Sequence, residues 1–191
     1  MSAHLVSICA NKRLERLITM PENNDLSKLV SDYAIENFQH GLNCAESVYN
    51  ALLRAGALEG VDPATTAMVL GFGGGVGLSG CICGALAGGI IANGAKYGRK
   101  DPYSVPEENR GSEIAARYYR RYNNLIHDFV ELYGSPLCKD ITGKYDDWHS
   151  RERKVGCLKM IGGAAALAYR YLQISQEESE KMEYQENLAD L

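Results

Sequence analysis

Six cysteines are the residues of this 191-residue chain whose chemistry and spacing point to a functional site: Cys9, Cys44, Cys81, Cys83, Cys138 and Cys157. A cysteine thiolate is a nucleophile and a soft metal ligand. The sequence contains no Cys-x-x-Cys, which excludes rubredoxin-like, thioredoxin-like and ordinary zinc-finger sites, and no Cys-x-x-Cys-His, which excludes covalently attached haem. Any shared site must therefore be assembled from distant parts of the chain.

Cys44 and Cys83 are expected at the starts of helices. Asn43 followed three residues later by Glu46 is a capping-box pattern, so Cys44 takes the first position of a helix. Cys83 follows a glycine-rich stretch and begins the next uncharged helix. Backbone N–H groups without helical partners, together with the positive end of the helix dipole, favour thiolate over thiol at such positions.

Cys138 and Cys157 are expected in similar places. Cys138 is predicted as the third residue of a short helix capped by Ser135. Cys157 follows Gly156 and is predicted to open the last core helix or to lie one turn inside it. Three or four of the thiols therefore belong to helix N-termini.

Helix ends alone cannot hold four thiolates together. Each helix end stabilises a neighbouring anion by about 0.3–1 kcal/mol. Two thiolates about 4 Å apart repel each other by about 4 kcal/mol at an effective dielectric constant near 20. If the four cysteines converge, they need cations among them, or they pair as disulfides.

The order of these elements resembles the C_GCAxxG_C_C family of redox-active proteins. The resemblance covers about residues 41–160 and rests on five elements in order: Asn43–Ser47, Gly71–Gly75, Cys83–Gly88, Cys138 and Cys157. The family is also similar to the cysteine-rich part of split-Soret cytochromes, where an iron centre is associated with those residues. The resemblance implies redox activity or cluster binding, and it supplies no substrate and no catalytic residue.

On this resemblance, an iron–sulphur centre is expected, of the two-iron type because four thiolates suffice for it. It would transfer single electrons to or from an unknown redox partner, and its ligands would be the four cysteines that match the family pattern: Cys44, Cys83, Cys138 and Cys157. Cys81 is an extra thiol that could serve as a further ligand, and Cys9 is expected to play no part. Backbone N–H groups, burial, and Lys139 or Lys159 would set the reduction potential.

Three other interpretations of the cysteines stay open. The first is a dithiol–disulfide couple without metal, formed by Cys44 with Cys81 or Cys83. The second is a structural zinc site in a non-catalytic scaffold. The third is that each cysteine is a buried small hydrophobic residue. A cluster would give a brown protein when purified without oxygen, whereas zinc and thiols are colourless.

Helical periodicity dominates the chain, so we predict an all-α fold: a single-domain helical bundle with a glycine-rich central loop between two buried helices. The expected helices cover 26–39, 43–56, 62–70, 83–98, a longest helix from the signature at 104–107 to 132, and a last core helix around 157–166. The domain is expected to span 25–174, with an N-terminal extension at 1–24 and a solvated acidic tail at 175–191 that is either partly helical or frayed.

The predicted longest helix has two faces. We expect an inward apolar face of Ile114, Tyr118, Tyr122, Leu125, Phe129 and Leu132, and an outward polar face of Arg117, Arg121, Asn124 and Asp128. On this pattern the run of arginines and tyrosines at 117–122 is an ordinary amphipathic surface rather than a nucleic-acid patch.

The uncharged centre, 63–95, contains six glycines between Gly71 and Gly80. Glycine at that density breaks a membrane helix, so a buried helix pair with close packing is predicted instead. The stretch Gly75–Gly80 fits the dinucleotide pattern Gly-x-Gly-x-x-Gly, but no strand precedes it, which argues against nucleotide binding.

Composition limits the class of protein. The formal net charge of −4, from 20 Lys and Arg against 24 Asp and Glu, argues against nucleic-acid binding. The apolar stretch at 4–10 has no basic segment ahead of it, unlike a signal peptide, so we expect a cytoplasmic protein without membrane association. Small residues at 84–89 and 162–166 would allow close helix packing and a homodimer.

Overall fold

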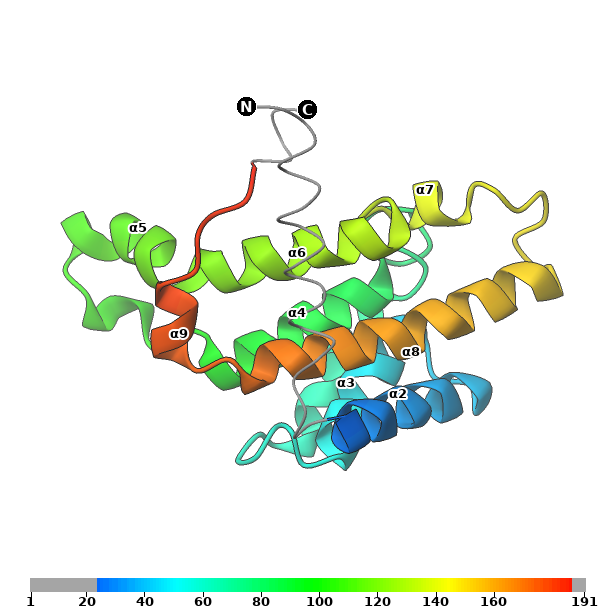
Figure 1. The fold of residues 1–191 in the computed structure, drawn as a ribbon, viewed down its shortest axis with the longest axis horizontal. Coiled ribbons are helices and arrows are strands. Elements are labelled where there is room, and N and C mark those ends of the chain that lie inside the picture. The colour runs from blue at the N-terminus through cyan, green and yellow to red at the C-terminus, as the bar shows by residue number, and fades with distance from the viewer. Residues whose placement is uncertain (1–23, 187–191) are drawn as a thin grey trace.

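A computed structural model describes residues 24–186 (Figure 1), so Cys9 and most of the predicted N-terminal extension lie outside the described residues. The main helices are α2 (Asn24–Gln39), α3 (Cys44–Arg54), α4 (Gly84–Tyr97), α6 (Tyr119–Tyr133), α7 (Cys138–Thr142), α8 (Arg151–Gln173) and α9 (Gln176–Glu180). Within the described residues there is no strand, only an isolated antiparallel bridge between Ile82 and Leu137. The predicted all-α class is confirmed.

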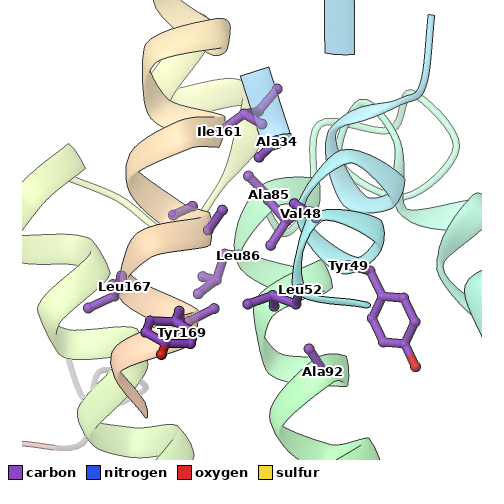
Figure 2. Close-up of a cluster of buried hydrophobic side chains, with 14 of the residues drawn as sticks. Ala34, Val48, Tyr49, Leu52, Ala85, Leu86, Ala92, Ile161, Leu167 and Tyr169 are labelled. Carbon is purple, nitrogen blue, oxygen red and sulfur yellow. The ribbon is translucent and has the colours of Figure 1, made fainter. Parts of the chain in front are cut away.

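Helix α8 runs through the middle of the molecule, with α6 on one side and α2 and α3 on the other (Figure 1). Figure 2 shows side chains of α3, α4 and α8 pointing toward one another in a single core, among them Leu52, Leu86 and Ile161. At Gly88 of α4, a Cβ atom would lie 2.5 Å from the carbonyl oxygen of Ala45. Only glycine lets α3 and α4 pack this closely, as the small-residue pattern predicts.

Local capping signals of α3 form as predicted. The side-chain oxygen of Asn43 accepts hydrogen bonds from the N–H groups of Ala45 at 2.9 Å and Glu46 at 3.1 Å. The Glu46 carboxylate accepts the N–H of Asn43 at 3.0 Å, which completes the capping box. Residue 44 is therefore fixed at the first position of α3.

The uncharged segment after α3 differs in detail from the prediction. Its first part, η1 (Pro63–Phe72), is a 3₁₀ helix rather than an α-helix. Asp62 caps it by accepting the N–H of Ala64, and the Thr65 hydroxyl donates to the Asp62 carbonyl at 2.5 Å, a local bond that tightens the first turn. No helix among the described residues is long and apolar enough to cross a membrane.

A tight left-handed loop connects η1 to α4. Five consecutive residues, 74–78, have positive φ, including Val76 at 62° and Leu78 at 67°. This conformation costs an L residue roughly 1–2 kcal/mol relative to the right-handed region, whereas glycine adopts it freely. The glycine density of the loop is therefore a backbone requirement.

The predicted longest helix does not form as one element. Residues 107–118 instead form η3 (Glu107–Asn109), α5 (Arg110–Glu113) and the π-helical turn η4 (Ile114–Tyr118), and α8 is the longest helix. The helix start expected from the signature at 104–107 is also wrong, because Ser104 caps no helix and its hydroxyl donates to the Asp101 carbonyl. A helix start formed by an N-cap residue and a following proline occurs instead at Asp101 and Pro102. There the Asp101 carboxylate accepts the N–H of Tyr103 at 2.8 Å.

The polar face predicted to point outward on α6 is wrong for three of its four residues. Arg121, Asn124 and Asp128 are buried, while Leu132, expected inward, is 44% exposed. The Arg121 guanidinium donates to the carbonyl oxygens of residues 171, 174 and 175 at the end of α8. The predicted outer face of α6 is covered because the chain after α8 packs across it. Helical periodicity within α6 does not indicate this packing.

The acidic C-terminal segment is partly helical, as predicted, but it also packs on the protein. Arg120 donates to the Met182 carbonyl at 2.6 Å, and the Asn124 amide donates to the Glu183 carbonyl at 3.0 Å. The Ser175 capping box begins α9, and many of its acidic side chains remain exposed. Residues 175–186 therefore cover one side of α6, while the predicted domain boundaries themselves stay a prediction.

Candidate functional site

Four cysteines from separate helix regions line one cavity of about 190 Å³: Cys44 of α3, Cys83 at the N-cap of α4, Cys138 of α7 and Cys157 of α8. The last three are buried and Cys44 is half-buried. Cys44 lies near enough to the other three thiols for its charge to raise the pKa of each of them. Residues separated by up to 113 positions in sequence are thereby brought to one site.

The position of Cys138 within its helix differs from the prediction, whereas Cys157 lies inside its helix, which is one of its two expected positions. Cys138 is the first residue of α7, not the third, because Leu137 is the N-cap and the Ser135 hydroxyl accepts the N–H of Leu137 at 3.1 Å. Cys157 is the seventh residue of α8, beyond the first turn. The reason is that the Ser150 hydroxyl caps the helix by accepting the N–H of Arg153.

A short bridge holds two of the cysteines beside each other. The N–H of Cys83 donates to the Pro136 carbonyl at 2.8 Å, and the N–H of Cys138 donates to the Cys81 carbonyl at 2.6 Å. These two backbone bonds tie the chain before α4 to the chain before α7. They fix the backbone at Cys83 and Cys138 independently of any ligand.

The glycine loop packs directly behind Cys138. A Cβ atom on Gly75 would lie 2.7 Å from the Cβ atom of Cys138 and 2.8 Å from the backbone nitrogen of Cys81. Across the cavity, a Cβ atom on Gly84 would lie 3.2 Å from the Cβ atom of Cys44 and 2.6 Å from the Phe72 carbonyl oxygen. Glycine at both positions lets the cysteine-bearing segments approach each other.

Burial, rather than the helix termini, dominates the ionisation of the thiols. Desolvation raises the pKa of Cys83 to about 12, although the N–H groups of Leu86 and Ala85 oppose this change. Burial likewise raises the pKa of Cys138 and of Cys157. The predicted preference for thiolate is therefore wrong for these three cysteines in the protein alone.

Arg153 and Trp148 were not among the predicted site residues. Arg153 is the one charged residue among those that line the cavity within the described chain. One guanidinium N–H group donates to the Cys157 sulphur at 3.7 Å, and the central carbon of the guanidinium lies 4.1 Å from the centroid of the Trp148 ring. Because Arg153 lies four residues before Cys157, helical spacing was the signal that could have identified it.

Met160 contacts the thiols although the sequence analysis did not predict it, whereas Lys139, Lys159 and Cys81 lie outside the cavity. Met160 lies one turn after Cys157, and its sulphur is 3.9 Å from the Cys83 sulphur. Lys139 and Lys159 do not line this cavity. Cys81 is exposed and is not a lining residue either, although its carbonyl oxygen accepts from Cys138.

Sulphur is the main donor atom of the cavity, because the oxygen atoms of the lining residues Asn43 and Thr142 are already hydrogen-bonded to backbone groups. No carboxylate or imidazole lines it, and apolar side chains such as Phe38, Leu78 and Ile141 surround the thiols. Across residues 24–186, no three Cys, His, Asp or Glu side chains are arranged to hold a metal ion. The thiols thus surround a space far larger than the roughly 10–15 Å³ that one water needs, instead of closing on one point.

Comparison with known proteins agrees with the geometry of the cysteines. A family described as "Putative redox-active protein (C_GCAxxG_C_C)" matches residues 42–171. The chain is also 31% identical over 143 residues to an uncharacterized protein of Archaeoglobus fulgidus, a match that covers 73% of this chain and 91% of that protein. No solved structure matches the chain.

Proposed function

Because the chain belongs to the C_GCAxxG_C_C family of redox-active proteins, we propose that its four clustered cysteines hold an iron–sulphur cluster and that the protein transfers single electrons. The observation that carries this proposal is that Cys44, Cys83, Cys138 and Cys157 line one cavity of about 190 Å³. A reducing compartment such as the cytoplasm would keep these thiols available.

The chemistry of the donors supports iron and sulphide over a single zinc ion. Four thiolates and no oxygen or nitrogen ligand are typical of iron–sulphur clusters and of zinc. The thiols line a space of about 190 Å³, which has room for a ligand made of several atoms. Cys81 would remain outside the ligand set.

The protein's own residues would control that centre. A bound cluster supplies reversible one-electron chemistry. Burial of Cys83 and the N–H groups of Ala85 and Leu86 would surround the ligand sulphurs with low dielectric and with positive dipoles. Arg153 would add a positive charge beside Cys157, which favours the reduced, more negative state.

A dithiol–disulfide function is less well supported by the same cavity. Thiol–disulfide exchange depends on a thiolate nucleophile, which in catalytic cysteines has a lowered pKa. Here burial raises the pKa values of Cys83, Cys138 and Cys157. A metal removes this obstacle, since a coordinating thiol is deprotonated outright.

Anoxic purification tests the proposal. Iron, acid-labile sulphide and zinc are counted per chain, and the visible absorption spectrum is recorded. We expect brown protein with iron and sulphide in equal amounts, a colour that Cys83→Ser abolishes and that Cys81→Ser, the matched exposed cysteine two residues away, leaves intact.

Other results would identify another function. A colourless protein with one zinc per chain would replace the redox proposal with a structural site. A metal-free protein in which reversible oxidation forms a disulfide between Cys44 and Cys83 would support the dithiol couple instead. Circular dichroism of Cys83→Ser separates loss of the cluster from loss of the fold.

A further inference from the structure

A second, larger cavity of about 810 Å³ adjoins the thiol cavity. It is bounded by the end of α6, by α7 and the residues that follow it, and by the N-terminal half of α8. Ile141, Cys157 and Met160 line both cavities and form the wall between them. Its volume lies in the range of small-molecule sites, about 300–1,000 Å³.

Two glycines of α8 shape this cavity. A side chain at Gly156 would occupy the place of the Tyr145 hydroxyl, and one at Gly163 would occupy the place of the Tyr133 hydroxyl. The two glycines are seven residues apart, so they lie on the same side of α8, about 10 Å apart along its axis. The tyrosines thus reach α8 two turns apart, and both line the cavity.

The charged groups of the cavity are mostly positive. Lys144, Arg151 and Lys159 line it, and Glu152 is the one acidic lining residue within the described chain. None of these three cations forms a salt bridge with another residue of 24–186. Arg151 and Lys159 are eight residues apart on α8 with Val155 between them, so two positive ends flank an apolar patch.

This positive charge is local to a chain that is otherwise acidic. Residues 139–159 carry six Lys and Arg against four Asp and Glu, whereas the rest of the chain carries fourteen against twenty. Apolar lining from Leu132, Val155 and Met160 completes a surface with an apolar floor and a cationic rim. An anion with a flat apolar body complements both parts.

We propose that the cavity formed by α6, α7 and the N-terminal half of α8 binds a phosphorylated aromatic small molecule. The aromatic body would lie against Val155 and the tyrosine side chains, and the phosphate would lie at the cationic rim that Lys144, Arg151 and Lys159 form around them. This inference concerns binding alone and does not depend on the nature of the centre in the thiol cavity.

Flavin mononucleotide is a suitable probe, because its fluorescence reports binding and riboflavin is the same ring system without the phosphate. The full chain is titrated with each compound, once with its metal content as purified and once after chelation. We expect flavin mononucleotide to bind in both preparations and riboflavin to bind about tenfold more weakly or worse, which corresponds to about 1.4 kcal/mol. Inorganic phosphate should compete with flavin mononucleotide and not with riboflavin.

Matched variants locate the site. Lys159→Ala and Arg151→Ala should each weaken binding of flavin mononucleotide about fivefold or more, because each removes a positive charge from the rim of the cavity. Lys154→Ala removes an exposed cation of α8 that does not line the cavity, so it should change binding less than twofold. Val155→Trp should weaken both flavins by filling the apolar patch.

Three results would overturn the inference. These are no binding of flavin mononucleotide up to millimolar concentration, equal affinity for the two flavins, or an effect of Lys154→Ala as large as that of Lys159→Ala. Because the substituted cations are exposed, circular dichroism should show unchanged folding in each variant. Because flavin mononucleotide is also titrated after chelation, failure of this binding proposal can be distinguished from failure of the iron–sulphur proposal.

Discussion

The two halves of α8 have different tasks. From Ile161 to Leu172 most side chains are buried, and they pack against α2, α3 and α4 (Figure 2). From Arg151 to Met160 only Cys157 and Met160 are buried, and the helix borders two cavities. One continuous helix thus joins a closely packed core to a region that keeps open volume around its chemistry.

Glycine has a different role in the packing of each half of α8. In the C-terminal half, Gly162 lets Ser31 and Ile35 of α2 approach so closely that a Cβ atom would lie 2.7 Å from the Ser31 hydroxyl. In the N-terminal half, Gly156 admits a tyrosine hydroxyl instead of a neighbouring helix. The packed half anchors the helix, so the other half can hold Cys157 in place without filling the space around it.

The largest effect on stability is expected from the packed half. Ile161→Ala removes a fully buried side chain and should lower the free energy of unfolding by about 2–5 kcal/mol. Val155→Ala, the matched aliphatic truncation in the open half, should change it by less than about 0.5 kcal/mol, since Val155 is 41% exposed. Urea denaturation of both variants measures their free energies of unfolding. Equal losses of stability in Ile161→Ala and Val155→Ala would contradict the distinction between a packed and an open half.

The next effect concerns pH and Cys83, a buried thiol that lines the smaller cavity and packs in the hydrophobic core. In metal-free protein, the Cys83 pKa is about 12 in the folded state against 9.0 for an unburied thiol. The unfolded chain therefore gives up this proton first as the pH rises, and the folded state loses stability between about pH 9 and pH 12. The loss should reach up to about 4 kcal/mol.

Denaturation at several alkaline pH values tests this expectation. Cys83→Ala should flatten the dependence of the unfolding free energy on pH in that window. A pH dependence equal to that of the unsubstituted metal-free protein would mean that other groups, such as Tyr133 with its raised pKa, control alkaline stability.

Sequence reasoning succeeded where the determining contacts are local. The capping box of Asn43 and Glu46 lies within four residues and formed as predicted. The prediction that Arg121 points outward was wrong, because its guanidinium donates to carbonyl groups fifty or more residues later, at the end of α8. No spacing within α6 carries that information.

The candidate site shows the same limit. The family pattern identified four cysteines that line one cavity, but it did not indicate Trp148 or Arg153 beside them. The spacing between Arg153 and Cys157 is local and could have been noticed, whereas the approach of Trp148 depends on the loop before α8. Burial, which reverses the expected ionisation of the thiols, depends on the whole fold.

A smaller effect is expected on the reduction potential of the centre. Arg153→Met removes the positive charge beside Cys157 while retaining an unbranched side chain, so the potential should fall by about 60 mV, or about 1.4 kcal/mol for one electron. Lys154→Met removes the neighbouring cation that does not line the thiol cavity. In an anoxic spectroscopic titration, the reduction potential of the Lys154→Met variant should stay near that of the unsubstituted protein. Equal shifts of the potential in both variants would indicate a general effect of net charge.

The smallest effect concerns the glycine loop that packs behind Cys138. Val76 has a φ of 62° and is 42% exposed, so Val76→Gly relieves a left-handed conformation at little cost in buried surface. Thermal unfolding should show a gain of about 0.5–1 kcal/mol after the greater chain entropy of glycine is included. Met68→Gly, at an exposed position without positive φ, should be destabilising; stabilisation by both substitutions would argue against strain at Val76.

The central claim is that Cys44, Cys83, Cys138 and Cys157 share one metal-containing centre. Anomalous diffraction at the iron absorption edge, from crystals of anoxically purified protein, tests it most directly. We expect an iron signal inside the cavity that these four cysteines line, within bonding distance of their sulphurs. Iron bound elsewhere, or a cavity without iron whose cysteines are joined as disulfides, would contradict it.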